Sequence, residues 1–193
     1  MKLYAANPPL YGATINKKKV FFADNMDYIE YIQNLFCKEN TICNLKNRVY
    51  TKKEITAILY KNRYYIDELN KVSNTYSIDP YVLEFLLYNR SLDQKKLVSL
   101  IKKTFKYVEV NNINNTLVLK ILYNNSIQTI FFTNRLFNDC IEVIKLIDRS
   151  EDYYILNGKQ VSIYGLMTIF SNFEPKNITR YKGLTLGRLY GNI

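Results

Sequence analysis

Three segments between residues 105 and 132 alternate apolar and polar side chains, and this pattern limits the fold more than any other feature of the sequence. The segments are Phe105–Val110, Thr116–Tyr123 and Ser126–Phe132, and Asn-rich stretches separate them. A period of two is typical of half-buried strands, and asparagine favours tight turns. The connections are too short for a crossover helix. The sequence therefore predicts an antiparallel β-meander in the middle of the chain.

Apolar residues at helical spacing flank this meander. Met26, Ile29, Ile32, Leu35 and Phe36 predict a helix that Asp24 or Asn25 caps. A capping box at Thr51–Glu54 opens one long helix, with inward positions from Ile55 to Val72. Further helices are expected from Asp79-Pro80 to about Tyr88, from about Asp93 to Lys103, from Thr133 or Asn134 to about Ile147, and from Ser162 to about Asn172.

The remaining segments are of β type. Strands are expected at Lys2–Ala6, Lys17–Ala23 and Asn177–Tyr181, with a basic turn over Gly12–Lys19 and a hairpin whose turn is Asn157-Gly158. Residues 40–50 are expected to be irregular, with one short strand at most. The order of these elements predicts an α+β fold in which helical and meander material is inserted between two β-type ends.

The charge balance favours a polyanionic partner. Lys and Arg number 27 against 17 Asp and Glu, which gives a net charge of +10. Such an excess on a small domain is common in nucleic-acid-binding proteins. The abundance of Lys, Asn, Ile and Tyr is also what an AT-rich genome produces without selection for binding. Composition alone therefore leaves both interpretations open.

Histidine and cysteine usage excludes several kinds of chemistry. The chain has no histidine, so it has no Ser-His-Asp or Cys-His machinery and no imidazole metal ligand. Its three cysteines include no Cys-x-x-Cys pair, and reduced thiols are expected. There is no apolar run of transmembrane length and no signal-peptide core near the amino terminus. We expect a cytoplasmic protein, in a bacterial or phage-infected host cell, with no membrane partner.

Two short segments at opposite ends of the chain carry a family resemblance. The first is Tyr4-Ala5-Ala6-Asn7-Pro8-Pro9-Leu10-Tyr11, followed by Lys17–Asp24, and the second is Ile178-Thr179-Arg180-Tyr181-Lys182-Gly183-Leu184. In this order they resemble the carboxyl-terminal half of the TOPRIM region of type IIA DNA topoisomerase B subunits, of the gyrase and topoisomerase IV kind. The intervening stretch is similar to the large insertion of Gram-negative gyrases.

The resemblance implies a domain plan and a set of DNA-binding residues. Residues 1–24 and 173–193 would supply TOPRIM strands, and residues 25–172 would form the insertion. Arg180, Tyr181, Lys182 and Gly183 would lie beside the cleaved DNA, and the turn lysines Lys17, Lys18 and Lys19 are further DNA-binding candidates. A structural strand ending in a glycine turn is the alternative for the first set, and a solvated hairpin for the lysines.

The same resemblance implies that the chain is not catalytic alone. In the family, a Glu and an Asp-x-Asp pair hold Mg²⁺ and precede the Pro-Pro-Leu-Tyr strand, at which this chain begins. The acidic pairs Asp24 and Asp27, Asp67-Glu68 and Glu151-Asp152 lack that spacing and are expected to be helix caps or solvated residues. No catalytic or metal residue is assigned, and no cofactor is expected on this chain; Mg²⁺ and ATP belong to the complete enzyme. The implied partners are DNA, the rest of the B subunit and the A subunit.

One departure leaves a second hypothesis open. The family continues Gly-Leu-Gly-Glu-Met where this chain has Gly183-Leu184-Thr185-Leu186-Gly187. The chain is therefore expected to be either a fragment or split subunit of a type II topoisomerase, or a non-enzymatic regulator that binds DNA or gyrase; an unrelated basic α+β domain is a third alternative. Lys52, Lys53, Lys61, Arg63 and Lys71 on the long helix would form a basic face for DNA or the A subunit, or a solvent face.

Overall fold

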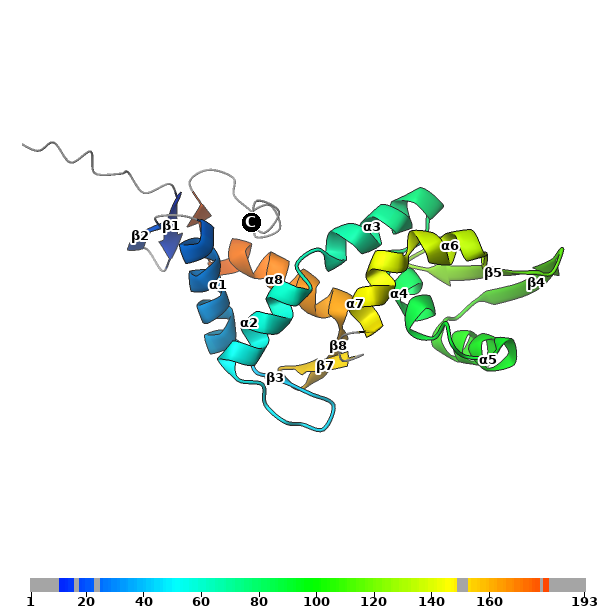
Figure 1. Cartoon of the computed structure of the whole chain (residues 1–193), viewed down its shortest axis with the longest axis horizontal. Helices are drawn as coiled ribbons and strands as arrows, with labels where there is room; N and C mark the ends of the chain where they lie inside the picture. Colours follow the sequence, from blue (N-terminus) through cyan, green and yellow to red (C-terminus); the bar gives the residue numbers. More distant parts are fainter. Residues whose placement is uncertain (1–10, 16–17, 23–24, 149–152, 178, 181–193) are drawn as a thin grey trace, which may run out of the picture. The chain divides into compact units, whose positions relative to one another are not determined.

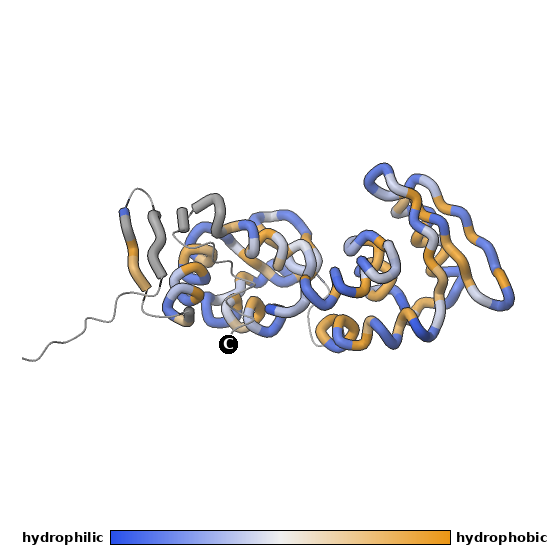
Figure 2. The backbone as a smooth tube through the Cα atoms, turned by 90° about the horizontal axis from the view of Figure 1, so that it is seen from above, coloured by the Kyte–Doolittle hydropathy of each residue, from blue (hydrophilic) through white to orange (hydrophobic). Residues whose placement is uncertain are grey.

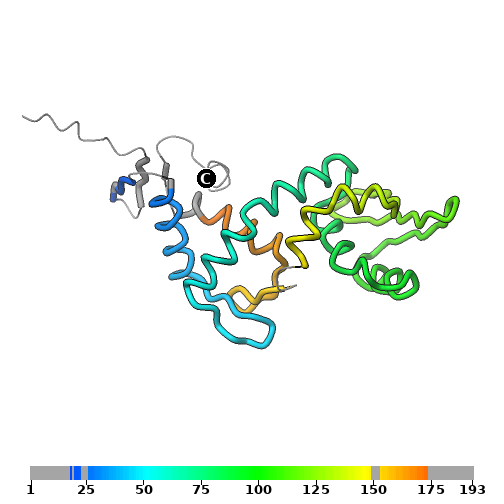
Figure 3. Tube along the Cα trace, viewed as in Figure 1, coloured from blue at the N-terminus to red at the C-terminus, as the bar shows by residue number. Residues whose placement is uncertain are grey.

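The computed structural model describes residues 11–15, 18–22, 25–148, 153–177 and 179–180, with the backbone alone at 11–15, 19, 25, 174–177 and 179–180. Helices and antiparallel sheets make up most of these residues, so the predicted α+β class is confirmed. The chain forms two compact units (Figure 1). Unit 1 is Met1–Tyr64 with Tyr153–Ile193, and unit 2 is Tyr65–Asp152. Figure 3 shows the trace leaving unit 1 in cyan and returning to it in orange.

A three-stranded sheet in unit 1 joins segments from the two ends of the chain. Its order is β2-β1-β9, with β1 at Tyr11–Ile15, β2 at Lys18–Phe22 and β9 at Thr179–Arg180. The predicted basic turn over Gly12–Lys19 was therefore wrong, because most of it is strand. Its residues Gly12–Ile15 pair with Lys18–Phe21 instead of looping between strands. The predicted strand at Lys2–Ala6 lies outside the described residues.

Three helices and a second sheet build the core of unit 1. The helices are α1 (Asn25–Glu39), α2 (Lys52–Lys61) and α8 (Ile163–Asn177), and the sheet order is β3-β7-β8, with β3 at Ile42–Cys43, β7 at Tyr153–Leu156 and β8 at Lys159–Ser162. Phe36 of α1 makes edge-to-face contacts with Phe170 and Phe173 of α8, at centroid distances of 5.1 and 5.3 Å. These aromatic contacts hold α1 against α8.

The predicted Asn157-Gly158 hairpin is confirmed. Asn157 and Gly158 have φ of 52° and 83°, the left-handed values that a type I′ turn requires. The turn is also bonded to the segment before β3: the Asn157 N–H donates to the Thr41 carbonyl at 2.8 Å, and the Thr41 N–H donates to Asn157 Oδ1 at 2.9 Å. Residues far apart in the sequence are thereby fixed together at one edge of unit 1.

Unit 2 contains the predicted meander and five helices. Its sheet order is β4-β5-β6, formed by Val108–Ile113, Thr116–Tyr123 and Ser126–Phe131, and all pairs are antiparallel. The helices are α3 (Tyr65–Tyr76), α4 (Pro80–Tyr88), α5 (Gln94–Thr104), α6 (Asn134–Asp139) and α7 (Ile141–Asp148). Figure 2 shows hydrophobic and hydrophilic residues alternating along these elements, as expected where each has one buried side.

Two predicted helices are each broken in two. The expected long helix after Thr51 ends at Lys61 and restarts at Tyr65, and the expected helix to Ile147 is interrupted at Cys140. At the first break the Asn62 side chain donates to the Ile58 carbonyl at 3.0 Å, and the same carbonyl accepts the Asn62 backbone N–H at 3.1 Å. The predicted helix starts at Thr51, Asp79, Asp93 and Thr133 are confirmed by their capping bonds.

The boundary between the units falls at this first break, inside the stretch that the family resemblance assigns to the insertion. The domain division at residues 24 and 172 stays a prediction.

Candidate nucleic-acid interface

The three-stranded sheet of unit 1 brings the two resemblance-bearing ends together. Ala13 of β1 pairs with Val20 on one side and with Arg180 on the other. Thr14 likewise lies between Lys19 and Thr179. The backbone of the Arg180 segment is therefore one strand away from the lysine-bearing strand β2. This register places two of the predicted basic segments in one sheet.

The predicted DNA-binding residues differ in how far the structure describes them. Lys18 begins β2, pairs with Ile15 and is exposed to solvent. Lys19 and Arg180 are placed by their strand positions. Lys17, Tyr181, Lys182 and Gly183 lie outside the described residues. The structure thus brings Lys18, Lys19 and Arg180 into one sheet.

Aromatic packing fixes β2 on the first helix of unit 1. Phe22 is buried, and its ring makes edge-to-face contacts with Tyr28 at 5.1 Å and with Tyr31 at 5.2 Å. Phe21, the preceding residue, is 57% exposed. This alternation anchors one side of the strand in the α1 core and leaves the other open to solvent. The lysine-bearing hairpin is therefore attached to a packed support.

The whole net charge of the protein resides in unit 1. This unit has 16 of the 27 Lys and Arg residues and only 6 of the 17 Asp and Glu residues, which accounts for the full +10. Unit 2 has 11 of each sign and is neutral overall. Because long-range attraction of a polyanion follows the local charge excess, the charge that would favour such a partner lies in the unit that holds the end strands.

The predicted basic face on the long helix does not form as expected. Its members are divided between α2 and α3, which belong to different units. Arg63 lies at the break, where its guanidinium stacks over the rings of Tyr60 at 3.9 Å and Tyr64 at 4.6 Å and donates to the Tyr60 carbonyl at 2.8 Å. Arg63 therefore stabilises the end of α2, and only Lys52, Lys53 and Lys61 remain together on that helix.

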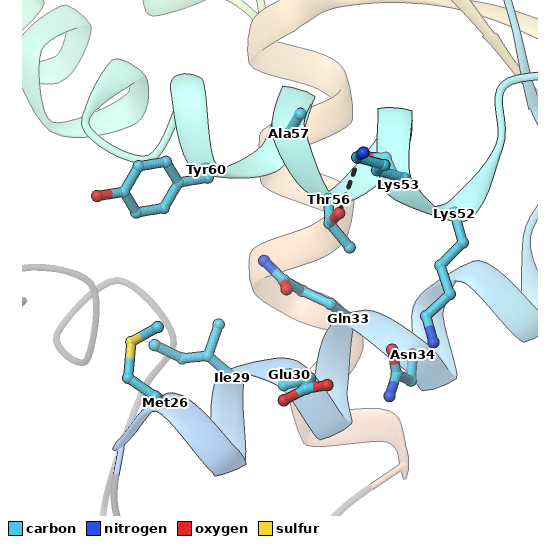
Figure 4. Close-up of a pocket in the computed structure, with 10 residues that line it drawn as sticks. All are labelled: Met26, Ile29, Glu30, Gln33, Asn34, Lys52, Lys53, Thr56, Ala57 and Tyr60. Atoms are coloured by element: carbon cyan, nitrogen blue, oxygen red, sulfur yellow. Dashed lines mark hydrogen bonds between the residues drawn. The ribbon is translucent and has the colours of Figure 1, made fainter.

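A groove of about 620 Å³ lies between α1 and α2 of unit 1 (Figure 4). Met26, Ile29, Ala57 and Tyr60 give it an apolar part, and Glu30, Gln33, Asn34, Lys52, Lys53 and Thr56 give it a polar part. Figure 4 shows Lys52 extending from α2 toward Asn34 of α1. The start of α2 is capped by Thr51 and Glu54, which accept each other's backbone N–H groups. The groove offers mixed polar contacts and no arrangement for nucleophilic or acid–base catalysis.

The acidic side chains and thiols of the described residues do not assemble into a metal site. Within the described part of the chain, no three His, Cys, Asp or Glu residues lie close enough to hold a metal ion. Asp27 lies in the first turn of α1, and Asp67 and Glu68 in the first turn of α3, where carboxylates favour the helix dipole. Burial raises the pKa of the Cys140 thiol to about 11.

One basic cluster was missed by the sequence analysis. Helix α5 carries four exposed lysines, Lys95, Lys96, Lys102 and Lys103. The signal was present in the sequence, because no acidic residue occurs between Asp93 and Glu109.

No protein-family model matches the chain, and no curated protein matches it. Among the described residues, no helix combines the length and the apolar character needed to cross a membrane.

Proposed function

We propose that the chain is a fragment or split subunit of an ATP-dependent type II DNA topoisomerase, which completes the TOPRIM DNA-cleavage region. One observation carries the proposal: the strand before Tyr181-Lys182-Gly183 pairs directly with the strand that follows Pro8-Pro9-Leu10. The strands β1 and β9, which contain the described residues next to the two motifs, are thus neighbours in one sheet, although some 165 residues separate them in sequence. A chance match of two motifs has no reason to produce such neighbours.

The charge distribution supports the same proposal. The sheet lies in the unit that holds the whole excess of positive charge, and Lys18 is exposed on it. Arg180, Lys182 and Lys17–Lys19 would neutralise phosphates of the cleaved segment, Tyr181 would lie beside it, and Gly183 would permit close approach of the backbone. The metal-binding carboxylates would come from the preceding part of the B subunit. DNA and the A subunit would be the other partners.

Reconstitution tests this proposal. The chain is combined with an A subunit and with a B-subunit fragment that carries the ATPase domain and the Glu and Asp-x-Asp motifs but ends before the Pro-Pro-Leu-Tyr strand. Mg²⁺-dependent plasmid cleavage is expected only when all three are present. The double variant Arg180→Gln/Lys182→Gln should lower cleavage at least about tenfold, as the loss of two phosphate contacts implies. The matched control Lys38→Gln/Lys46→Gln, which removes the same charge from exposed positions in unit 1, should not.

Two results would overturn the proposal. The first is cleavage by the chain alone, because the proposal requires the catalytic carboxylates to come from another polypeptide. Cleavage by the other two polypeptides without the chain shows that it is not part of the cleavage region.

The departure at Thr185 favours the second candidate, a regulator that binds DNA or gyrase without catalysis. A glycine and a glutamate of the family motif are replaced there, in the turn that would shape the cleavage site. A regulator would change the supercoiling rate of a complete gyrase when added to it, and would do so without any B-subunit fragment. A subunit fragment would act only in the reconstituted enzyme.

A further inference from the structure

We propose that unit 2 carries a second, sequence-independent nucleic-acid site on helix α5, distinct from the end-strand sheet of unit 1. The site is the α5 lysine face, which consists of Lys95, Lys96, Lys102 and Lys103 around Ser99. Its ligand is the phosphate backbone of a nucleic-acid duplex. This inference does not rest on the topoisomerase proposal, because it concerns residues in the other unit.

Helical geometry gathers these residues on one face. Leu97 and Ile101 are buried and mark the inner side of α5. With 3.6 residues per turn, Ser99 lies on the opposite side, and the four lysines flank it in two pairs one turn before and one turn after. All four lysines and Ser99 are exposed. The outer face of the helix therefore carries the Ser99 hydroxyl between two pairs of lysine ammonium groups.

Intramolecular pairing does not account for these charges. None of the four lysines forms an ion pair with another residue in the described ranges, whereas Arg48, Arg90 and Lys145 do. The acid nearest in sequence, Asp93, accepts the backbone N–H of Lys96 as the helix cap. The ammonium groups are thus available to a partner, although unit 2 as a whole is neutral.

Helix stability does not account for them either. Lysines in the last turn, such as Lys102 and Lys103, favour the helix dipole, but Lys95 and Lys96 lie in the first turn, where positive charge opposes it. The other long helix of this unit, α3, has the favourable arrangement, with the acidic residues Asp67 and Glu68 in its first turn. Helix α5 has no acidic residue in its first turn. The only carboxylate at the start of α5 is that of the N-cap Asp93, so the dipole favours Lys102 and Lys103 but gives no reason for Lys95 and Lys96.

Shallow grooves run along both sides of the lysine face. One has a volume of about 700 Å³ and is lined by Gln94, Lys95, Val98, Ser99, Lys102 and Val110, so it lies between α5 and β4. The other, of about 440 Å³, includes Lys96, Leu100 and Lys103. Ser99 lines both. Serine and glutamine side chains donate hydrogen bonds to phosphate oxygens, so the grooves add polar contacts to the charge.

The spacing fits a duplex backbone better than an acidic peptide. The two lysine pairs are seven residues apart, about 10 Å along the helix axis. Duplex DNA presents a negative charge about every 1.7 Å along its axis, so two pairs at this separation meet phosphates in many registers. The lysine ammonium is a point charge and lacks the planar fork with which arginine binds a carboxylate in two places. This property suits a contact that has no sequence preference.

Lysine acetylation with and without nucleic acid tests the site on the intact chain. A mild acetylating reagent is applied to the protein alone and with a 20-base-pair duplex DNA, and mass spectrometry reads each lysine separately. Lys95, Lys96, Lys102 and Lys103 should be protected at least about fivefold, while Lys71 and Lys120, which are exposed on unit 2 outside α5, report unspecific shielding. Equal reactivity of the α5 lysines with and without DNA would overturn the proposal, as would equal protection by polyglutamate.

Binding measurements supply a second readout. Lys95→Gln/Lys96→Gln/Lys102→Gln/Lys103→Gln should reduce the slope of log K against log salt by about 3 to 4, since each phosphate contact contributes about 0.9. Ser99→Asp should weaken duplex binding about tenfold by placing a negative charge at the centre of the face. Ser126→Asp, at an exposed strand position of the same unit, is its control. An unchanged salt slope with a folded quadruple variant contradicts the site and leaves the reconstitution test of the end strands unaffected.

Discussion

The Tyr65 hydroxyl donates a hydrogen bond of 2.7 Å to Glu84 Oε2 in the interior of unit 2. Tyr65 is fully buried and Glu84 is 3% exposed, so the pair joins the start of α3 to α4 out of contact with water. A buried carboxylate is costly unless it is hydrogen-bonded, and the phenol supplies such a bond. The relation ties the first residue of unit 2 to its core.

Removal of this hydroxyl should destabilise the protein. Tyr65→Phe is expected to lower the free energy of unfolding by about 1–3 kcal/mol, because the Glu84 carboxylate loses a donor that water cannot replace. Tyr107→Phe is the matched control, since Tyr107 makes the same kind of bond to Glu109 at the surface and should have a smaller effect. Urea unfolding at pH 7 measures both. Equal effects would show that burial of the pair contributes nothing.

The same pair predicts a loss of stability at alkaline pH. Burial, and secondarily the Glu84 charge, raises the pKa of Tyr65 above its ordinary value of 10.0. Below pH 10 the phenol is protonated in both states; above it, the unfolded state loses the proton while the folded state keeps it. Unfolding is therefore favoured as the pH rises above 10. The decline in unfolding free energy between pH 9 and 11 should be shallower in Tyr65→Phe. A parallel decline would contradict the assignment to this residue.

The helix breaks show where local sequence reasoning succeeded and where it failed. Capping boxes and Asp or Thr caps predicted most helix starts, because those signals act within four residues. The end of α2 was missed because residues 62–64 contain neither glycine nor proline. Asparagine ends this helix instead: Asn62 donates its side-chain N–H to the carbonyl four residues earlier, and Asn40 and Asn89 do the same at 3.0 and 2.8 Å. This repeated use of asparagine was visible in the sequence.

The candidate site required contacts that no local pattern specifies. Strand patterns predicted β2 and β9 nearly at their observed positions, but periodicity cannot say which strands pair, and Ala13 and Arg180 are far apart in the sequence. The concentration of charge in unit 1 was also hidden, because the unit boundaries at Tyr64 and Tyr153 lack the linker composition that marks many domain borders.

The Asn157 side chain should matter beyond the turn itself. Its side-chain amide accepts a hydrogen bond from the Thr41 N–H and donates one to Asn40 Oδ1, each at 2.9 Å. These two hydrogen bonds connect the β7–β8 hairpin to the end of α1. Asn157→Gly keeps a residue that tolerates φ of 52° and removes these bonds, so unfolding free energy should fall by about 1 kcal/mol. The unfolding free energy of Asn157→Ala should be lower still, because alanine is also strained in the left-handed backbone conformation. Thermal unfolding of both variants separates the two contributions, and equal values would remove the case for strain.

Glu54 predicts a loss of stability in acid. Hydrogen bonds from the Arg48 guanidinium, and next from the Thr51 backbone amide, lower its pKa from 4.5 to about 2. The ionised carboxylate stabilises the folded state above pH 4.5, and this contribution disappears as the pH falls toward 2. The melting temperature of Glu54→Gln should therefore decline less between pH 5 and 3 than that of the wild type. Arg48→Gln should flatten the same profile, whereas an unchanged profile in both variants would exclude this pair as the cause.

The Cys140 thiol should be inert until the break between α6 and α7 opens. Cys140 is fully buried and its pKa is raised to about 11 by burial, so almost no thiolate exists at pH 8. Cys43 is partly exposed and should be alkylated first. Iodoacetamide labelling at pH 8, read for each cysteine by mass spectrometry, is expected to modify Cys140 only in proportion to urea-induced unfolding. Labelling of Cys140 at the Cys43 rate in native buffer would show that unit 2 opens at this break while the rest of the chain stays folded.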